Sequence, residues 1–317
     1  MNQGIIQTID IKKHFAIGRQ QLVKSVDGIS IEIYQGETFG LVGESGSGKS
    51  TFGKTIVGLT NPTEGAVYYE GSNVKDLSKK EQQRVNREVQ IIFQDPQASL
   101  NPRMQVGDII AEGIDAHGLA KGKQRKERIY DLLERVGMNP DVVKRYPHEF
   151  SGGQRQRIGI ARTLAVKPKF IVADEPISAL DVSIQAQVLN LLNDLKDSED
   201  LTYLFIAHDL SMVKHISDRI GVMYLGSMME LTNSQKLFNE PKHPYTQALL
   251  SAVPVPDPTI SRRDRIVLQG DPPSPVNPPN GCKFRTRCPH AMEICSLKAP
   301  EWKEIQSDHW TACHLYS

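Results

Sequence analysis

The hydrophobic residues of this chain fall into short apolar runs separated by longer stretches with helical spacing. Apolar and polar residues alternate over 5–15 and 22–33, which predicts two antiparallel strands at the edge of a sheet. Continuous apolar runs predict further strands at 38–42, 65–70, 89–93, 170–173 and 202–207. Helical spacing predicts helices at 51–59, 75–87 and 182–196, and an insert of several short helices at about 99–146. Strands that alternate with helices in this way predict an α/β fold.

With 39% hydrophobic and 24% charged residues, the composition is that of a globular protein. The length of 317 residues is enough for two structural units. Lysine plus arginine (38) nearly balances aspartate plus glutamate (37), so no global field favours nucleic acid or an anionic membrane. The longest uncharged stretches, such as 220–229, are too short to cross a bilayer. Asp10, Lys12 and Lys13 stand where a signal peptide needs an apolar run. We therefore expect a cytoplasmic protein that works at a membrane only when docked on a partner.

A glycine-rich segment between the predicted strand at 38–42 and the following helix fits the pattern G-x-x-x-x-G-K-S. Its residues are Gly43, Glu44, Ser45, Gly46, Ser47, Gly48, Lys49 and Ser50, followed by Thr51. Such a turn points several backbone N–H groups inward at the positive end of a helix, which makes a cradle for a polyphosphate. Lys49 is then expected to reach the β- and γ-phosphates of a nucleotide, and the Ser50 hydroxyl to ligate Mg²⁺.

Polar residues follow several predicted strands, at the carboxyl edge of the sheet where ligands gather in such folds. Asp174 and Glu175 come directly after a buried strand. Asp174 is expected to hold Mg²⁺, and Glu175 to orient and deprotonate a water for attack on the γ-phosphate. Gln94 and His208 end two other strands; each is either a ligand of the nucleotide site or an ordinary strand-end residue. Phe15, upstream of the loop, is either a ring that stacks on adenine or a half-buried strand residue.

A second candidate anion site lies at Ser151-Gly152-Gly153-Gln154, where another helix is predicted to begin. Ser151 is a good helix N-cap, and the two glycines let a ligand approach the first turn closely. The positive end of this helix therefore predicts an anion-binding site about a hundred residues after the phosphate loop.

The order of these motifs resembles that of the ATP-binding subunits of ABC transporters, over residues 1 to about 250. The resemblance implies a P-loop NTPase core with a mixed sheet and flanking helices, an antiparallel β subdomain, and a helical subdomain at about 99–165. It implies these roles: Phe15 stacks on adenine, Gln94 is the Q-loop glutamine and a Mg²⁺ ligand, Asp181 is the D-loop aspartate, and His208 is the switch histidine.

The same resemblance implies that two such domains meet head to tail, with the helix end at 151–154 of one covering the γ-phosphate held by the other. Phe150 departs from the family pattern, because leucine usually precedes the serine, but it keeps an apolar anchor. ATP then joins the pair, hydrolysis releases it, and the helical insert pushes on a membrane partner through a contact expected at 95–106. The second ATPase is either a paralogue or a further copy of this chain.

All four cysteines, Cys282, Cys288, Cys295 and Cys313, follow a stretch, 241–279, that holds ten of the nineteen prolines and is expected to be extended and unable to continue the sheet. Their spacing is C-x₅-C-x₆-C-x₁₇-C. Thiols confined to one tail of a cytoplasmic protein argue against disulfides and for a metal. Four thiolates suit zinc or an iron–sulfur cluster, and gaps wider than the C-x₂-C pairs of zinc ribbons favour iron–sulfur. Four unliganded buried thiols are the alternative.

The segments 242–246 and 281–315 resemble the C-terminal extension of oligopeptide and dipeptide importers, in some of which the cysteines hold a four-iron, four-sulfur cluster. We therefore divide the chain into a nucleotide-binding domain (1–240) and an extension (241–317). The resemblance implies an ATPase that powers peptide import at the cytoplasmic face of the cell membrane, peripherally bound. Its implied partners are two transmembrane permease subunits, a second ATPase subunit and an extracytoplasmic peptide-binding protein, and no nucleic acid.

The sequence leaves three alternatives to consider. The same engine could drive another small cargo such as nickel. A soluble ABC ATPase outside transport usually carries two cassettes or a long coiled-coil insert, and this sequence shows neither. A binding module with degenerate nucleotide sites is disfavoured because Lys49, Asp174, Glu175 and His208 are all present.

Overall fold

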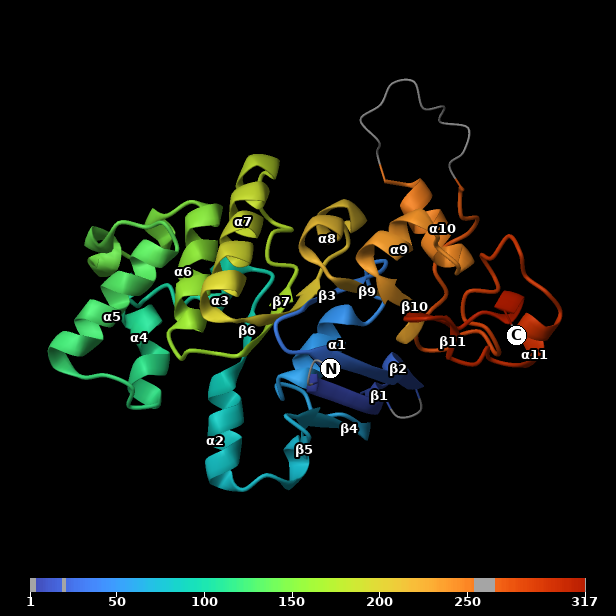
Figure 1. Ribbon diagram of the computed structural model, residues 1–317, viewed down its shortest axis with the longest axis horizontal. Helices are drawn as coiled ribbons and strands as arrows, with labels where there is room; N and C mark the ends of the chain where they lie inside the picture. Colours follow the sequence, from blue (N-terminus) through green and yellow to red (C-terminus); the bar gives the residue numbers. More distant parts are fainter. Residues whose placement is uncertain (1–3, 19–20, 254–265, 317) are drawn as a thin grey trace. The chain divides into compact units, whose positions relative to one another are not determined.

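The computed structural model describes residues 4–18, 21–253 and 266–316, which form two compact units (Figure 1). We call them the helical unit, residues 34–36 and 76–204, and the P-loop unit, residues 4–33, 37–75 and 205–316. The division at residue 240 expected from the sequence stays a prediction.

The P-loop unit contains a four-stranded sheet with the order β2-β1-β4-β5. Its strands are β1 (Gly4–Ile17), β2 (Gln21–Tyr34), β4 (Glu64–Tyr69) and β5 (Ser72–Asn73). β1 and β4 are antiparallel, with Ile6 opposite Tyr69 and Ile9 opposite Ala66. The two alternating runs near the start of the sequence are thus strands as predicted, but they belong to this separate sheet.

A second set of strands in the P-loop unit has the order β11-β12-β10-β9-β3, followed by the end of β8. The strands are β3 (Thr38–Val42), β8 (Thr202–Ile206, shared with the helical unit), β9 (Arg219–Tyr224), β10 (Ser227–Asn233), β11 (Lys303–Gln306) and β12 (His309–Thr311). β3 and β9 are parallel, and the other neighbours from β9 to β11 are antiparallel. All five residues of β3 are buried, which explains its continuous apolar sequence.

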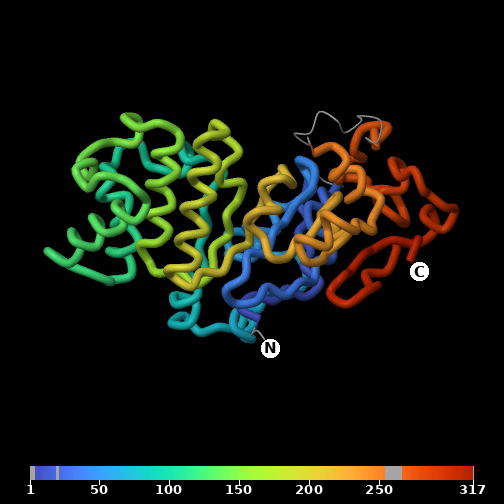
Figure 2. Tube along the Cα trace, turned by 45° about the horizontal axis from the view of Figure 1, so that its top comes forward, coloured from blue at the N-terminus to red at the C-terminus, as the bar shows by residue number. Residues whose placement is uncertain are grey.

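The stretch 241–279 is expected from the sequence to be extended, and this is wrong for residues 244–251, which form helix α10. No described residue of the stretch joins the sheet, but the chain returns to it further on, at β11 and β12. In β12, Thr311 lies opposite Glu230 and Trp310 opposite Leu231 of β10. Figure 2 shows the red C-terminal segment returning along the orange one. The helices of this unit are α1 (Lys49–Ile56), α8 (Leu210–Ile216), α9 (Ser234–Asn239), α10 (Pro244–Ser251) and α11 (Ile294–Leu297), with short 3₁₀ turns at Val74–Asp76 and His314–Tyr316.

The helical unit carries parallel strands β6 (Val89–Ile92) and β7 (Phe170–Asp174), with the start of β8 beside β7. Its helices are α2 (Lys79–Glu88), α3 (Pro96–Ser99), α4 (Val106–Ala116), α5 (Gly122–Arg135), α6 (Gly152–Leu164) and α7 (Val182–Glu199), with 3₁₀ turns at Pro140–Lys144 and Pro147–Glu149. α6 packs against α3, α4, α5 and α7, which confirms the predicted helical insert (Figures 1 and 2).

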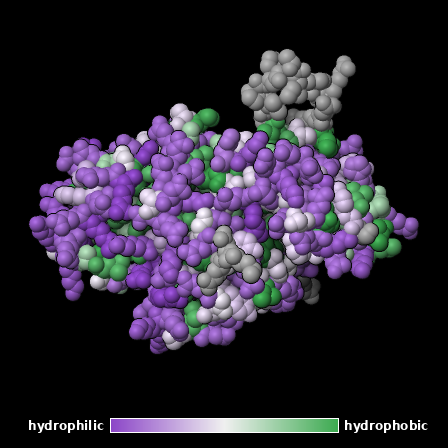
Figure 3. Space-filling view, viewed as in Figure 1, coloured by the Kyte–Doolittle hydropathy of each residue, from purple (hydrophilic) through white to green (hydrophobic). Residues whose placement is uncertain are grey.

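No helix within the described ranges is long and apolar enough to span a bilayer. The face shown in Figure 3 is mostly hydrophilic, with hydrophobic side chains scattered over it. Isolated apolar residues of this kind are normal on a protein surface and do not mark a binding site.

Candidate nucleotide site and C-terminal extension

The phosphate loop connects β3 to α1, as the sequence predicts. Two of its glycines are required by close backbone contacts. A Cβ on Gly43 would lie 2.1 Å from the Met223 carbonyl oxygen, and one on Gly48 would lie 1.9 Å from the Ser25 carbonyl oxygen. Gly48, at φ +99°, is also the N-cap of α1 in a left-handed conformation that other residues rarely adopt. The loop is therefore built from backbone packed closely against neighbouring backbone.

The Lys49 side chain is held over the phosphate loop by backbone carbonyl groups of the loop itself. The side chain is almost completely buried, and its Nζ donates to the carbonyl oxygens of Gly43 at 2.8 Å and Glu44 at 3.0 Å. Ser47 is also buried, and its N–H donates to the Glu44 carbonyl at 3.1 Å. A single ammonium fixed at the N-terminus of a helix fits the charge and size of a polyphosphate.

Two further predicted residues belong to the P-loop unit. Phe15 lies near the end of β1 with 41% of its surface exposed, and Lys13 Nζ lies 5.0 Å from the centre of its ring. This ring offers a face on which a base could stack. His208 lies two residues after the end of β8, and the next residue, Asp209, caps α8 by accepting from the N–H of Ser211 at 2.8 Å.

In the helical unit, the structure brings Gln94 and Glu175 together. The Gln94 side-chain amide donates to Glu175 Oε2 at 2.9 Å. Asp174 ends β7 and is 3% exposed, whereas Glu175 takes a left-handed conformation with φ +46°. Such a backbone conformation is uncommon for a residue other than glycine and is found more often at functional sites. An amide and two carboxylates are suitable groups for holding Mg²⁺ and a water.

The helix end at Ser151 has the local structure that its sequence predicts. Ser151 and Gln154 form a capping box, with the Ser151 N–H donating to Gln154 Oε1 at 3.0 Å and the Gln154 N–H donating to Ser151 Oγ at 3.3 Å. Phe150 is buried, in agreement with its expected role as an apolar anchor. Ser151 and Gln154 line an open pocket of about 470 Å³ within the helical unit. Ser151 and Gly152 are exposed, so a partner molecule can reach this helix end.

The beginning of α7 lies beside this helix end. Asp181 is the N-cap of α7, but its side chain makes no capping hydrogen bond. A Cβ on Gly153 would lie 2.5 Å from Cγ2 of Ile184, so the glycine lets α6 and α7 approach closely. The absence of a cap bond leaves the exposed Asp181 carboxylate available to a partner.

The predicted nucleotide-site residues thus fall into two sets, one in each unit. The P-loop unit holds Phe15, the loop residues Gly43 to Thr51 and His208, and the helical unit holds Gln94, Ser151 to Gln154, Asp174, Glu175 and Asp181. The role of each residue in ATP binding or hydrolysis stays a prediction.

Sequence reasoning missed two residues that hold the phosphate loop from the C-terminal side. The Tyr245 hydroxyl accepts from the Glu44 N–H at 2.9 Å, and Arg287 forms an ion pair with the Glu44 carboxylate at 2.8 Å. Tyr245 stands in the segment 242–246 that resembles other importers, but its sequence does not indicate a partner 201 residues away.

The four cysteines are free thiols in the described structure. Burial, with smaller contributions from the neighbouring thiols of Cys282, Cys288 and Cys295, raises the pKa of the Cys313 thiol to about 11. However, the described residues bring no three or more histidine, cysteine, aspartate or glutamate side chains into an arrangement that could hold a metal ion. The arrangement of these thiols therefore does not support the predicted iron–sulfur or zinc site.

Comparison with known proteins agrees with the fold and the loop. Residues 26–178 match the ABC transporter family, and residues 229–295 match the family described as oligopeptide/dipeptide transporter, C-terminal region. Among solved structures, the ABC transporter cassette MJ0796 in its dimeric ADP- and phosphate-bound form has a TM-score of 0.65 and 28% identity, covering 72% of this chain and 98% of that one. CbiO1 of Clostridium perfringens has a TM-score of 0.65 and 25% identity, covering 75% and 92%.

Relatives of known class extend the match through the C-terminal extension. YkfD of Bacillus subtilis (strain 168), named as a putative oligopeptide transport ATP-binding protein, is 60% identical over 98% of this chain and 95% of its own. The oligopeptide transport ATP-binding proteins AppF of the same organism and OppF of Haemophilus influenzae (strain ATCC 51907 / DSM 11121 / KW20 / Rd) are 54% and 49% identical, covering 99% and 98% of this chain and 98% and 94% of theirs. The chain therefore belongs to the ABC transporter family, among the ATP-binding proteins of the oligopeptide type.

Proposed function

We propose that this chain hydrolyses ATP to power the import of oligopeptides or dipeptides through a membrane permease. The observation that carries the proposal is the identity of 49–60% to oligopeptide transport ATP-binding proteins, which continues through the C-terminal extension. An ABC ATPase with another cargo or without a permease shares the core, but residues 229–295 match the C-terminal region of oligopeptide and dipeptide transporters.

The P-loop unit binds the nucleotide. The backbone N–H groups of the loop and the Lys49 ammonium hold the β- and γ-phosphates. Phe15, with its exposed ring, stacks on the adenine base, and His208 contacts the γ-phosphate. The tight backbone contacts at Gly43 and Gly48 support this role, because they fix the loop before any ligand arrives.

The helical unit supplies the groups for hydrolysis. Glu175 orients the attacking water and accepts its proton, and the hydrogen bond from Gln94 fixes one oxygen of that carboxylate. Ser50, Gln94 and Asp174 are the residues that hold Mg²⁺, which when bound neutralises phosphate charge. Both Glu175 and its backbone are held in one conformation, since the Ser178 N–H and hydroxyl donate to the Glu175 carbonyl at 3.2 and 3.1 Å.

We propose that a second ATPase subunit completes each site. The exposed helix end at 151–154 meets the nucleotide bound by the partner subunit. The Asp181 carboxylate, which makes no capping hydrogen bond to α7, meets the same nucleotide. The dimeric cassette MJ0796 bound to ADP and phosphate supports such a pair. The two ATPase subunits lie on the cytoplasmic face of the membrane and dock on two permease subunits, with the segment 95–106 as the contact. A peptide-binding protein outside the cytoplasm delivers the cargo to the permease.

Replacing Glu175 by glutamine tests the catalytic part of this proposal. We expect Glu175→Gln to bind MgATP as the wild type does, to lose turnover at least a hundredfold, and to form a dimer that ATP stabilises. Single-turnover hydrolysis and size-exclusion chromatography with ATP measure these effects. The exposed Glu301→Gln provides a matched control that should keep full turnover. Normal turnover in Glu175→Gln would exclude Glu175 as the base.

The transport part is tested separately, in the cells that express this chain. After detergent extraction, the tagged chain should co-purify with permease subunits, and deleting it should abolish uptake of radiolabelled tri- and tetrapeptides. Co-purification with ribosomes, together with unchanged peptide uptake, would favour a non-transport ABC ATPase.

We further propose that Cys282, Cys288, Cys295 and Cys313 hold an iron–sulfur cluster, with zinc as the alternative. Their number and their spacing support the proposal. Because the described arrangement is not that of a metal site, binding requires these side chains to move closer together. Protein purified without oxygen should be brown, with four irons per chain expected for a four-iron cluster. A colourless protein with stoichiometric zinc would overturn the iron–sulfur assignment, and one with neither metal would overturn both.

A further inference from the structure

Glu44, the second residue of the phosphate loop, is held through all of its polar groups. Its carbonyl oxygen accepts from Lys49 Nζ at 3.0 Å and from the Ser47 N–H at 3.1 Å. Its N–H donates to the Tyr245 hydroxyl at 2.9 Å, and its carboxylate pairs with Arg287. The peptide that presents an oxygen to Lys49 is therefore fixed from outside the loop, by two residues of the C-terminal extension.

The Arg287–Glu44 ion pair is largely shielded from water. Arg287 Nη1 lies 3.1 and 2.8 Å from the two carboxylate oxygens of Glu44, and the two side chains are 8% and 24% exposed. The same Nη1 lies 3.4 Å from the Tyr224 hydroxyl. A charged pair in such surroundings holds its geometry better than a surface pair, because water and salt compete with it less.

Tyr245 is placed just as firmly. Its ring is buried against Tyr224 and Phe284, with ring centres 4.7 and 5.3 Å away. Its N–H donates to Nδ1 of His243, which caps α10 at 3.0 Å. The N–H of His243 in turn donates at 2.9 Å to Glu230, which is completely buried. A continuous series of hydrogen bonds therefore runs from β10 through the start of α10 to Glu44.

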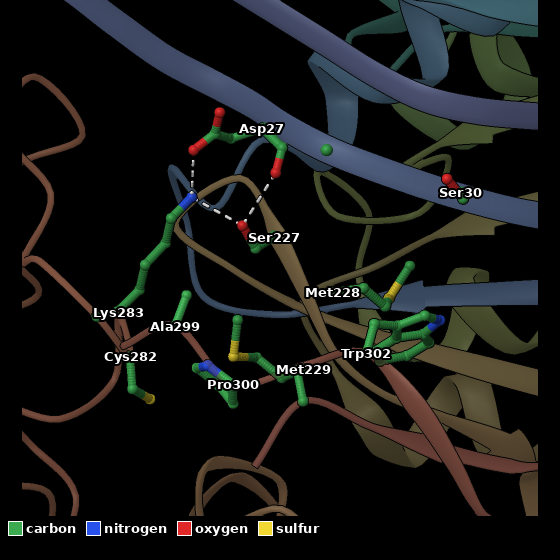
Figure 4. A pocket seen from close by; sticks show the side chains of 13 residues that line it. Asp27, Ser30, Ser227, Met228, Met229, Cys282, Lys283, Ala299, Pro300 and Trp302 are labelled. Atoms are coloured by element: carbon green, nitrogen blue, oxygen red, sulfur yellow. Dashed lines mark hydrogen bonds and ion pairs between the residues drawn. The ribbon is translucent and has the colours of Figure 1, made fainter. Parts of the chain in front are cut away.

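A third attachment fixes the segment that carries Arg287. Lys283 Nζ donates to Asp27 at 2.9 Å, to the Leu225 carbonyl at 3.0 Å and to Ser227 at 2.7 Å, and Figure 4 shows it reaching Asp27 and Ser227 beside a cavity of about 280 Å³. Phe284 follows directly and is completely buried. The position of Arg287 is thus determined by its neighbours in the segment, not by the ion pair alone.

We propose that Arg287 and Tyr245 are positioning residues of the ATP site, which act through Glu44 to set the orientation of the phosphate loop and of Lys49. The extension is then a structural part of the nucleotide site in addition to any role it has in transport. The inference rests on the proposed ATP binding by this loop. It explains why Tyr245, in the segment 242–246, and Arg287, between Cys282 and Cys288, both bond to Glu44.

The test is the affinity of the full-length chain for MgATP, measured by isothermal titration calorimetry in Arg287→Gln, Arg287→Lys and Tyr245→Phe. We expect Arg287→Gln to weaken binding about tenfold, which equals about 1.4 kcal/mol, and Arg287→Lys to restore most of it. Tyr245→Phe, which removes one oxygen atom, should weaken binding about threefold, as expected for one neutral hydrogen bond. In ATPase assays the change should appear mainly in KM, because Arg287 does not contact the reacting groups.

Two residues offer matched controls. Arg285 lies in the same segment and donates to the Asn280 carbonyl at 2.9 Å, with no bond to the phosphate loop among the described residues. Tyr203 is a buried tyrosine whose hydroxyl has no hydrogen-bond partner within the described structure. Arg285→Gln and Tyr203→Phe should bind MgATP like the wild type.

The outcomes separate the possible failures. A wild-type chain that does not bind MgATP would refute the proposed function itself. If the wild type binds and both Arg287→Gln and Tyr245→Phe match their controls, only the positioning role is refuted. If the double variant Arg287→Gln, Glu44→Gln binds MgATP as tightly as the wild type, the arginine merely neutralises the Glu44 charge near the phosphates. This result would also refute the positioning role. Should Arg287→Gln not fold, the milder Tyr245→Phe decides.

Discussion

Glu230 is the residue whose replacement should most clearly loosen the C-terminal extension. Its Oε1 accepts from the Lys242 N–H and from His309 Nε2, both at 2.7 Å, and its Oε2 accepts from the His243 N–H at 2.9 Å. Both oxygens therefore face N–H donors. In Glu230→Gln one oxygen becomes an NH₂ group, and no orientation of the amide can avoid placing this donor opposite another donor.

The expected loss follows from the number of bonds and their burial. Glu230 and His309 are completely buried, so water cannot replace a lost hydrogen bond. One charge-assisted bond is worth about 1.5–3 kcal/mol, and a buried donor left unsatisfied costs about 1–3 kcal/mol. We expect Glu230→Gln to lower the free energy of unfolding of the P-loop unit by about 3 kcal/mol, which corresponds to a fall in Tm of roughly 10 °C for a unit of this size.

The two tryptophans of the chain make the assay specific. Trp302 and Trp310 stack with ring centres 6.2 Å apart, and Trp310 in β12 lies opposite Leu231, the neighbour of Glu230. Tryptophan fluorescence during urea unfolding therefore reports on the attachment of the extension. Glu240→Gln is the control, because the Glu240 side chain is 59% exposed and its surface pair with Lys242 contributes little. Equal urea midpoints for Glu230→Gln and Glu240→Gln would refute the reasoning.

Three further predictions concern the phosphate loop, the pH dependence of stability and the binding of the adenine base. Gly48→Ala should abolish measurable MgATP binding, because its Cβ would meet the Ser25 carbonyl, whereas Gly58→Ala, also at positive φ but in open space, should bind normally; calorimetry distinguishes them. Burial lowers the pKa of His243 to about 4, so this imidazole takes up a proton in the unfolded state before it does in the folded state. The free energy of unfolding should therefore decrease by about 3 kcal/mol as the pH falls from about 6.5 to 4. The same pH series with His243→Gln should show a shallower fall. Phe15→Ala should weaken ATP binding about tenfold while leaving tripolyphosphate affinity unchanged; equal weakening of both would exclude stacking.

The parts of the site that are local in sequence could be predicted from it. The strand at 38–42, the glycine-rich turn and Lys49 are contiguous, and a wholly buried strand leaves a continuous apolar run. The capping box at Ser151 is likewise complete within four residues. In these segments hydrogen bonding and burial act over a few positions, so the residue types alone determine the local structure.

The attachments of the extension could not be predicted in this way. α10 lies in a proline-rich stretch and was missed, although Pro244 occupies the first turn of a helix, where a missing N–H costs nothing. β12 has three residues, too few for a clear alternating pattern, and its partner Glu230 is 81 positions from Thr311. The Glu44–Arg287 pair joins residues 243 positions apart, and each of them alone is an ordinary charged residue.

These long-range contacts change how the extension should be regarded. Residues 205–316 and the phosphate loop belong to one compact unit, and β12 is hydrogen-bonded to β10 within it. A buried carboxylate such as Glu230 is stable only while its donors from the N-cap residue of α10 and from β12 remain in place. Removal of the extension would therefore leave Glu230 unsatisfied and release Glu44 at the same time. The stability of this unit and the geometry of its phosphate loop thus depend on the same few hydrogen bonds, so a change in one should be accompanied by a change in the other.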